Sequence, residues 1–327
     1  MREALFWEAL EGERVRCDLC PHHCVIEPGK RGICGVRSNE EGVLIPLSYG
    51  KVTSLAMDPI EKKPLYHFCP GSSILSVGSY GCNLSCDFCQ NYAIAKGQPA
   101  FRQMIPEELV QVALSVEGNG AIAFTYNEPL MAFEYVYDTA RLAQAQGLRV
   151  VLVTNGFVEK EPLDLLLPYI DAMNIDLKAF NDAFYTQICK GQRQGVLETI
   201  ARVVGKTHVE LTTLLIQGEN TDREELEAMF RWIAGLDPAI PLHLSRYFPS
   251  YKRTDPPTPE ATLDQAVKWG RQQLDYVYAG NMQTDRNTYC PQCQGVVIER
   301  SLTGTHKHVE RGHCPHCGTF IALVDDE

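Results

Sequence analysis

Residues 78–91 read GSYGCNLSCDFCQN and place three cysteines, Cys82, Cys86 and Cys89, directly after a short apolar run, Ile74–Val77. Cysteine thiolates are the usual ligands of iron–sulfur clusters, and three thiolates this close together can bind three irons of a [4Fe–4S] cluster. No fourth cysteine follows at a ferredoxin spacing, so one iron is left open for chemistry. A structural zinc site that borrows a distant fourth ligand is the alternative interpretation.

The apolar run before these cysteines is the first of seven that predict the strands of one sheet. The predicted strands are Ile74–Val77, Ala121–Tyr126, Arg149–Thr154, Ala172–Leu177, His208–Ile216, Pro241–Tyr247 and Tyr276–Ala279. Most are continuously apolar rather than alternating, which is typical of strands buried on both faces of a parallel sheet.

Helical patterns lie between the predicted strands. Thr221 and Glu224 form a candidate capping box ahead of an apolar stripe, and Pro106 suits the first turn of another helix. Repeated strand–helix alternation predicts an α/β fold, a closed or partial (β/α)6-type TIM barrel. We expect its chemistry at the carboxyl ends of the strands, with a long loop, Pro249–Pro259, near the mouth.

Composition narrows the class of protein. The 327 residues include 45% hydrophobic and 22% charged residues, and the formal net charge is -11. This acidic balance disfavours nucleic acid as a partner. No run of apolar residues is long enough for a membrane span, and the N-terminus lacks the pattern of a signal peptide. We therefore expect a cytoplasmic protein whose thirteen cysteines serve as metal ligands rather than disulfides.

Two further groups of four cysteines lie toward the ends of the chain. The C-terminal group, in residues 285–327, is a pair of Cys-x2-Cys knuckles 20 residues apart, which predicts a zinc-ribbon module, with rubredoxin-like iron as the alternative. The N-terminal group, in residues 1–60, predicts a site for zinc or a second [4Fe–4S] cluster; its spacing matches no ferredoxin closely and favours zinc or a structural role. Residues 61–284 form the predicted barrel. The predicted terminal ligands are Cys17, Cys20, Cys24 and Cys34 in the first group, and Cys290, Cys293, Cys314 and Cys317 in the second.

The Cys-x3-Cys-x2-Cys spacing, with Phe88 before the last cysteine, resembles the signature of the radical S-adenosylmethionine (SAM) superfamily. Residues 66–279 resemble the glycyl-radical activating enzymes, including the pyruvate formate-lyase activating enzyme. The resemblance implies that the open iron binds SAM and that a 5′-deoxyadenosyl radical abstracts hydrogen from a substrate, which we expect to be a protein or peptide. It also implies a reductant such as flavodoxin or ferredoxin.

The ends of the predicted strands resemble the same enzymes. Tyr126, Asn127 and Glu128 stand where the superfamily carries a Gly-Gly-Glu-Pro-like segment that binds the SAM amino group. Residues 153–157 resemble a Thr-Asn-Gly element, and residues 174–178 an Asp-x-Lys element beside SAM. Arg246 could meet the SAM carboxylate or a substrate anion, whereas we expect His243 to be a wall residue. The resemblance thus implies a cofactor-binding set of Phe88, Tyr126, Asn127, Glu128, Asn155, Asp176, Lys178 and Arg246.

Nearly the whole chain resembles the AmmeMemoRadiSam system radical SAM enzymes, on the RCDLCPH segment at residues 16–22, the segment Pro64–Ser72 and the C-terminal knuckles. This resemblance implies AMMECR-type or Memo-type protein partners but no particular reaction. The alternative function is a metal-stapled interaction module that binds protein or RNA without SAM turnover. Cys69 is expected to be a buried thiol, and the role of Cys189 stays open.

Overall fold

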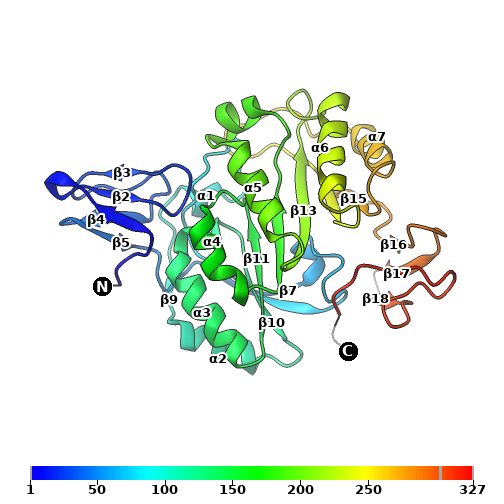
Figure 1. Cartoon of the computed structure of the whole chain (residues 1–327), viewed down its shortest axis with the longest axis horizontal. Helices are drawn as coiled ribbons and strands as arrows, with labels where there is room; N and C mark the ends of the chain where they lie inside the picture. Colours follow the sequence, from blue (N-terminus) through cyan, green and yellow to red (C-terminus); the bar gives the residue numbers. More distant parts are fainter. Residues whose placement is uncertain (1, 302–303, 326–327) are drawn as a thin grey trace.

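The computed structural model describes residues 2–301 and 304–325. Its centre is an eight-stranded sheet (Figure 1). In spatial order the strands are β15 (Val277–Gly280), β14 (Leu242–Arg246), β13 (His208–Leu215), β12 (Ala172–Asp176), β11 (Arg149–Thr154), β10 (Ala121–Phe124), β8 (Ser73–Gly78) and β7 (Ser54–Pro59). All neighbouring pairs are parallel except β7 with β8. The seven predicted strands and the parallel α/β fold are therefore confirmed.

Each of the six connections between successive parallel strands contains at least one helix. The main helices are α2 (Pro106–Ser115), α3 (Phe133–Ala145), α4 (Lys160–Leu166), α5 (Arg193–Val203), α6 (Arg223–Leu236) and α7 (Glu260–Gly270). They lie on one face of the sheet (Figure 1) and bury their apolar stripes against it. Two shorter helices, α1 (Tyr92–Ala95) and the π-helix η5 (Phe184–Cys189), lie in loops at the ends of strands.

The predicted helix starts are partly right. Pro106 occupies the first turn of α2 as expected. The cap of α6 is Asp222 rather than Thr221, because the Asp222 carboxylate accepts hydrogen bonds from the backbone N–H groups of Glu224 (2.9 Å) and Glu225 (3.1 Å). A carboxylate at this position also stabilises the positive end of the helix dipole.

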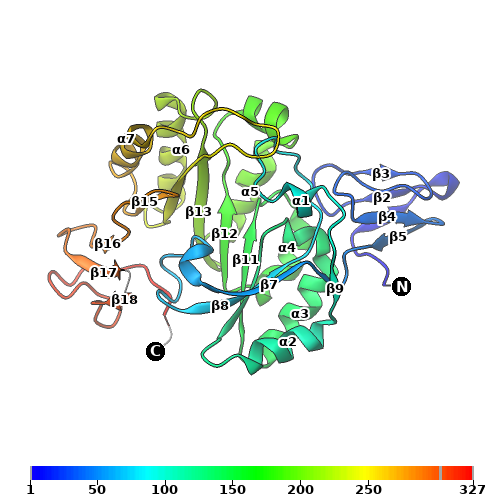
Figure 2. The same cartoon turned by 180° about the vertical axis from the view of Figure 1, so that it is seen from behind.

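The sheet is open, with β7 and β15 at its two edges. Residues 60–72, which connect β7 to β8, lie against the face that the helices leave free (Figure 2). Buried Glu210 on β13 accepts hydrogen bonds from the backbone N–H groups of Tyr66 (2.9 Å) and His67 (2.7 Å). The apolar side chains of this segment join a second core with residues of β8, β10, β11 and β12. A loop therefore fills the inside of the curved sheet.

Two small antiparallel modules lie at opposite ends of the molecule (Figures 1 and 2). The N-terminal module consists of β1 (Trp7–Ala9), β2 (Val15–Cys17), β3 (Val25–Ile26) and the hairpin of β4 (Arg37–Glu40) and β5 (Val43–Pro46), while β6 (Lys51–Val52) pairs with β9 (Arg102–Gln103). The C-terminal module contains β16 (Thr288–Tyr289), β17 (Val296–Ser301) and β18 (Gly304–Lys307). None of the described helices is both long and apolar enough to span a bilayer.

Candidate active site and cysteine groups

Cys82, Cys86 and Cys89 lie in the loop that follows β8, where they line a cavity of about 380 Å³. The other walls come from the carboxyl ends of the parallel strands β10 to β14, as the fold predicts. A cavity of this size suits a small-molecule ligand. Seven of the eight predicted cofactor-binding residues line it: Phe88, Tyr126, Asn127, Glu128, Asn155, Asp176 and Lys178.

The eighth predicted residue, Arg246, is not among the residues that line this cavity. Its Nε donates to the carbonyl of Thr258 (2.7 Å), and its Nη1 lies 2.6 Å from a carboxylate oxygen of Glu260. The guanidinium is thus engaged at the start of α7, and contact with a ligand in the cavity would require this ion pair to open.

The cysteine loop is held in place by the loop after β14. Arg253 forms an ion pair with Asp87, which lies between two of the cysteines, at 3.0 Å, and the backbone N–H of Lys252 donates to the Asp87 carbonyl (2.9 Å). The Ser250 hydroxyl donates to the Cys89 carbonyl (3.3 Å). The long loop predicted at Pro249–Pro259 therefore packs against the cysteine segment at the mouth of the cavity.

Asn127 and Tyr126 organise the opposite wall. The Asn127 side chain accepts from the backbone N–H of Ser79 (2.9 Å) and donates to the carbonyl of Gly81 (3.1 Å). Tyr126 adopts a φ of 73°, a left-handed conformation that favours glycine. Its hydroxyl donates to Asp58 (2.6 Å), and this anchor helps the tyrosine keep the backbone path that a glycine would give.

Glu128 joins the ends of two strands. It is buried, and its carboxylate accepts from the Thr154 hydroxyl (2.7 Å), the backbone N–H of Asn155 (2.7 Å) and that of Leu130 (3.1 Å). Burial dominates and raises the pKa of Glu128 to about 7, although these hydrogen bonds oppose the shift. The carboxyl group is therefore poised to ionise when a cation enters the cavity.

Cys86 lies in a charged environment. A hydrogen bond from Cys189, on η5, and the nearby Lys178 ammonium lower the pKa of Cys86 despite its burial. Burial alone would lower the pKa of Lys178, but the charges of Asp176, Cys86 and Cys189 outweigh it and raise that pKa well above its usual value. Lys178 Nζ lies 2.8 Å from an Asp176 carboxylate oxygen. The arrangement favours the thiolate form that binds metals.

These residues fit a [4Fe–4S] cluster with one iron that the protein does not ligate. Three cysteines on one loop face the cavity, and the described lining includes no fourth cysteine. Asn155 Nδ2 lies 3.7 Å from the Cys82 sulfur and can donate a hydrogen bond to it. Hydrogen bonds to cluster sulfurs tune the reduction potential.

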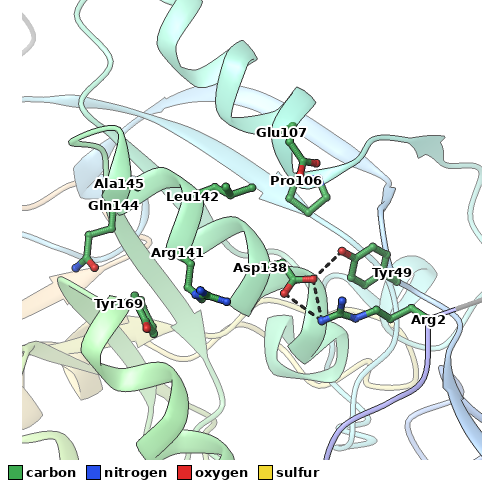
Figure 3. Close-up of a pocket in the computed structure, with 10 residues that line it drawn as sticks. All are labelled: Arg2, Tyr49, Pro106, Glu107, Asp138, Arg141, Leu142, Gln144, Ala145 and Tyr169. Atoms are coloured by element: carbon green, nitrogen blue, oxygen red, sulfur yellow. Dashed lines mark hydrogen bonds and ion pairs between the residues drawn. The ribbon is translucent and has the colours of Figure 1, made fainter.

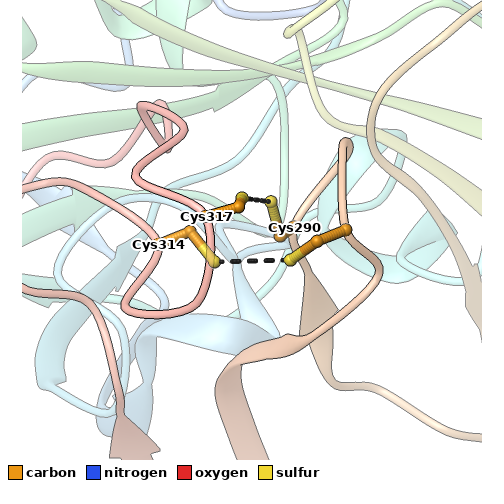
Figure 4. Close-up of side chains that lie close together, drawn as sticks. Cys290, Cys314 and Cys317 are labelled. Carbon is orange, nitrogen blue, oxygen red and sulfur yellow. Dashed lines mark hydrogen bonds between the residues drawn. The ribbon is translucent and has the colours of Figure 1, made fainter.

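The C-terminal cysteines form a compact metal site (Figure 4). The sulfurs of Cys290 and Cys317 lie 3.5 Å apart, and those of Cys293 and Cys314 lie 3.6 Å apart. All four sulfurs are within 4.8 Å of one another. A zinc ion with Zn–S bonds of about 2.3 Å places tetrahedral sulfurs about 3.8 Å apart, so these four cysteines can bind one metal ion.

The N-terminal cysteines surround one small enclosed pocket, which is also lined by Arg37 and Asn83. Three of the four, all but Cys24, are buried. Among the described residues, only the C-terminal cysteines bring three or more ligand atoms within 4.8 Å of one another. The N-terminal sulfurs are therefore spaced more widely.

Two other pockets are present, one adjoining this site and one separate from it. A cavity of about 820 Å³ shares Lys62, Pro64, Ser245 and Asn281 with the cysteine-lined cavity and extends toward the buried pair of His243 and Glu210. A separate pocket between α3 and Tyr49 holds an ion pair of Arg2 and Asp138 (Figure 3). It contains none of the predicted site residues.

Three residues of the site were not predicted. Asn83 accepts from the side chain of Asn155 (2.9 Å), Cys189 contacts Cys86, and Lys63 lines the cavity beside Asp58 (2.8 Å). Asn83 lies within residues 78–91, so its polar character beside the cysteines was the available signal, whereas Lys63 lies just before the segment Pro64–Ser72 and had no such signal. His243 is a buried wall residue as expected, hydrogen-bonded to Glu210 at 2.7 Å. Cys69 is buried as expected and accepts a hydrogen bond from Arg149 (2.7 Å).

Comparison with known proteins agrees with this geometry. Residues 76–233 match the pattern of the Radical SAM superfamily. The chain is 43% identical to an uncharacterized protein from Methanocaldococcus jannaschii over 337 residues, which covers 99% of this chain and 100% of that one. It is 26% identical to the pyruvate formate-lyase-activating enzyme of Clostridium pasteurianum over 43% of this chain and 63% of the relative. The fold is similar to that of Streptococcus suis SuiB bound to S-adenosylmethionine, with a TM-score of 0.52 and 11% identity over 66% of this chain and 50% of SuiB.

The chain therefore belongs to the radical SAM superfamily. Within it, the chain is related to the glycyl-radical and pyruvate formate-lyase activating enzymes. Membership implies a [4Fe–4S] cluster and SAM as cofactors, and the relatives support SAM-dependent radical chemistry.

Proposed function

We propose that this protein is a radical SAM enzyme of the AmmeMemoRadiSam type, which cleaves SAM reductively and abstracts hydrogen from a protein or peptide substrate. The observation that carries the proposal is the convergence of Cys82, Cys86 and Cys89 with seven predicted SAM-binding residues on one cavity. An interaction module without turnover would not need polar residues from five strand ends to meet beside a cysteine triad.

The side chains have distinct roles in this proposal. The three cysteines hold the cluster, which when bound supplies the electron that splits SAM into methionine and a 5′-deoxyadenosyl radical. Glu128, with its carboxyl group poised to ionise, stabilises the SAM amino group. The Lys178 ammonium and Asp176 line the same cavity as the three cysteines and would position the polar part of SAM. The loop of residues 247–259 shields the site from water.

The adjoining cavity of about 820 Å³ is the proposed entry for the substrate. Its walls carry both charged and aromatic side chains, including Lys62, Tyr66 and Arg286, which suits a peptide segment. The pyruvate formate-lyase-activating relative is named for an action on another enzyme, which supports a protein substrate. Partners of the AMMECR or Memo type and a reductant of the flavodoxin or ferredoxin class complete the proposed system, in the cytoplasm.

We propose zinc at the C-terminal site. The sulfur–sulfur distances of 3.5 and 3.6 Å suit a single tetrahedral ion, and all four positions are occupied by cysteine, which is typical of structural rather than catalytic zinc. The same distances also suit a rubredoxin-like iron, so metal analysis distinguishes the two.

The test is the formation of 5′-deoxyadenosine by anaerobically reconstituted protein with dithionite and SAM, measured by mass spectrometry. We expect product from the wild type and none above background from Cys86→Ala. The matched control is Cys69→Ala, which removes a buried cysteine outside all three groups and should retain activity. Equal product from Cys86→Ala and wild type would contradict the proposal, as would a lack of product from wild type that carries its cluster.

A further inference from the structure

The three cysteine groups fall into two geometric classes. The C-terminal sulfurs lie close enough to meet at one ion. Within the part of the chain that the structure describes, any three of the N-terminal sulfurs include at least one pair farther apart than 4.8 Å, and so does the central triad. The central triad belongs to a superfamily that binds a [4Fe–4S] cluster, so the wider spacing is the one this chain uses for a cluster.

The N-terminal thiols are subject to two opposing effects. Burial raises the pKa of each thiol, and the backbone groups of Leu19, His22, Ile33 and Val36 partly oppose this rise at Cys17, Cys20, Cys24 and Cys34, respectively. Backbone groups that favour the thiolate in this way also tune cluster potentials. Four thiols that line one enclosed pocket are arranged as ligands rather than as ordinary core residues.

A buried cation faces the same pocket. The Arg37 side chain is 1% exposed and lines the pocket, and its charge acts on both Cys17 and Cys34. One side of the guanidinium pairs with Glu134 at 2.7 Å, but its Nε is buried without a hydrogen-bond partner among the described residues. A buried N–H without a partner is costly, and an anionic cluster in the pocket would supply the missing acceptor.

The pocket is connected to the active site by two amides. Asn83 lines the pocket together with Cys20, and its Nδ2 donates to the carbonyl of Phe157 (2.6 Å). Asn155 Nδ2 donates to Asn83 Oδ1 at 2.9 Å and lies 3.7 Å from the Cys82 sulfur. Two hydrogen-bonded amides therefore connect the wall of the N-terminal pocket to a cysteine of the central triad.

We propose that Cys17, Cys20, Cys24 and Cys34 bind a second iron–sulfur cluster of the [4Fe–4S] class, which delivers electrons to the central site through Asn83 and Asn155. A one-electron reductant of the flavodoxin or ferredoxin class loses one electron to the N-terminal cluster. That cluster then passes the electron on, so the central site is reduced by one electron and the N-terminal cluster returns to its oxidised state. Cys24 is only partly buried, and its neighbours Val25 and Ile33 are 53% and 54% exposed, so the outer side of the group is open to a donor.

The cluster assignment is independent of the proposed function, whereas the delivery role rests on it. The first experiment therefore uses a chain without the central site, the triple variant Cys82→Ala, Cys86→Ala and Cys89→Ala. After anaerobic reconstitution we expect about four irons and four sulfides per chain, and an electron paramagnetic resonance signal of a reduced [4Fe–4S] cluster after dithionite. Adding Cys20→Ala and Cys24→Ala should remove the iron and the signal, and a protease-resistance assay shows whether the chain still folds.

Zinc in place of iron in the triple variant overturns the assignment, as does a [4Fe–4S] signal that persists when Cys20 and Cys24 are also replaced. A failure of the wild type to form 5′-deoxyadenosine would refute the proposed function and leave this iron count unaffected. The two failures are therefore distinguishable.

The second experiment tests the connection with Asn83→Leu, which removes the side-chain hydrogen bonds of Asn83 with Asn155 and with the carbonyl of Phe157. A flavodoxin-driven assay requires the protein path, whereas dithionite can reduce the central site directly. We expect 5′-deoxyadenosine formation with reduced flavodoxin to fall about tenfold more than formation with dithionite. An equal loss in the two assays would indicate a merely structural role for Asn83 and overturn the delivery path.

Discussion

The N-terminal and C-terminal modules each contain four cysteines, yet the sulfurs are arranged differently in the two. The C-terminal sulfurs converge, with two of them exposed, and the two knuckles repeat one backbone pattern. In each knuckle a backbone N–H donates to the first cysteine's carbonyl, from Gln294 to Cys290 (3.0 Å) and from Gly318 to Cys314 (2.9 Å). Gln294 and Gly318 both have positive φ, at 59° and 75°.

The N-terminal sulfurs are spread around a buried pocket and connect to the active site. The comparison shows that the number of cysteines alone does not determine which metal centre a module can bind. The spacing of the sulfurs and the groups that donate to them decide between a single structural ion and a cluster.

The largest expected effect separates the two modules by their metals. Among the described residues, the hydrophobic cluster of the C-terminal module is small (Cys290, Val297, Cys314 and Ile321), so the metal supplies most of the module's stability, on the order of 10 kcal/mol. We expect Cys290→Ser with Cys314→Ser to abolish zinc binding and expose this module to limited proteolysis while iron content stays at the wild-type level. The matched variant, Cys17→Ser with Cys20→Ser, should lose iron and keep zinc. Loss of the same metal from both variants would contradict the prediction that the two modules bind different metals.

A smaller effect is expected at the buried ion pair beside the N-terminal pocket. Arg37 and Glu134 are 1% and 0% exposed, and Arg37→Met would leave the Glu134 carboxylate buried without its cation. We expect a loss of about 3–5 kcal/mol in the free energy of unfolding, measured with urea. Arg37→Met with Glu134→Met should recover most of this stability, because apolar residues replace both charges. An unchanged unfolding free energy in the single variant would contradict the role of this pair.

The smallest effect concerns the contact between the segment of residues 60–72 and the C-terminal module. His67 lies between the carbonyl of Ala322 (2.8 Å) and the hydroxyl of Tyr278 (2.6 Å), and burial lowers its pKa to about 4. Because the unfolded chain binds a proton near pH 6.5 and the folded chain does not, stability falls as the pH drops from about 6.5 toward 4.

We expect wild type to lose about 2 kcal/mol between pH 6.5 and pH 5 relative to His67→Gln, which has no proton to take up. Thermal unfolding at the two pH values measures this difference. His308→Gln, at a half-exposed histidine of the same module, is the control and should behave like wild type. Identical pH dependence of stability in His67→Gln and wild type would show that protonation of His67 does not weaken the contact with the C-terminal module.

The sheet could be predicted from the sequence because its strands are buried on both faces and read as uninterrupted apolar runs. The residues at their carboxyl ends followed from the topology, since parallel strands bring Glu128, Asn155 and Asp176 to one edge. Strand β7 could not be predicted in this way. It lies at an edge of the sheet, and Leu55 and Met57 are 37% and 38% exposed, so its sequence lacks the continuous apolar run of a buried strand.

The contacts that distinguish the cysteine groups also escaped prediction. Asn83 meets Asn155 across 72 positions, and Arg37 meets Glu134 across 97 positions. No local pattern records such pairs, because each partner is acceptable in its own segment as an ordinary polar residue. The spacing of the N-terminal cysteines favoured zinc or a structural role, whereas their three-dimensional surroundings favour a cluster.

The hydrogen bond between His67 and Ala322 spans 255 positions, and Val324 pairs with Phe68 in a β-bridge beside it. During synthesis on the ribosome, the segment of residues 60–72 emerges long before the residues that secure it. We expect this segment to be fixed late, after the rest of the sheet has formed, because distant contacts form slowly. Folding of the C-terminal module would then be the step that closes the interior of the sheet.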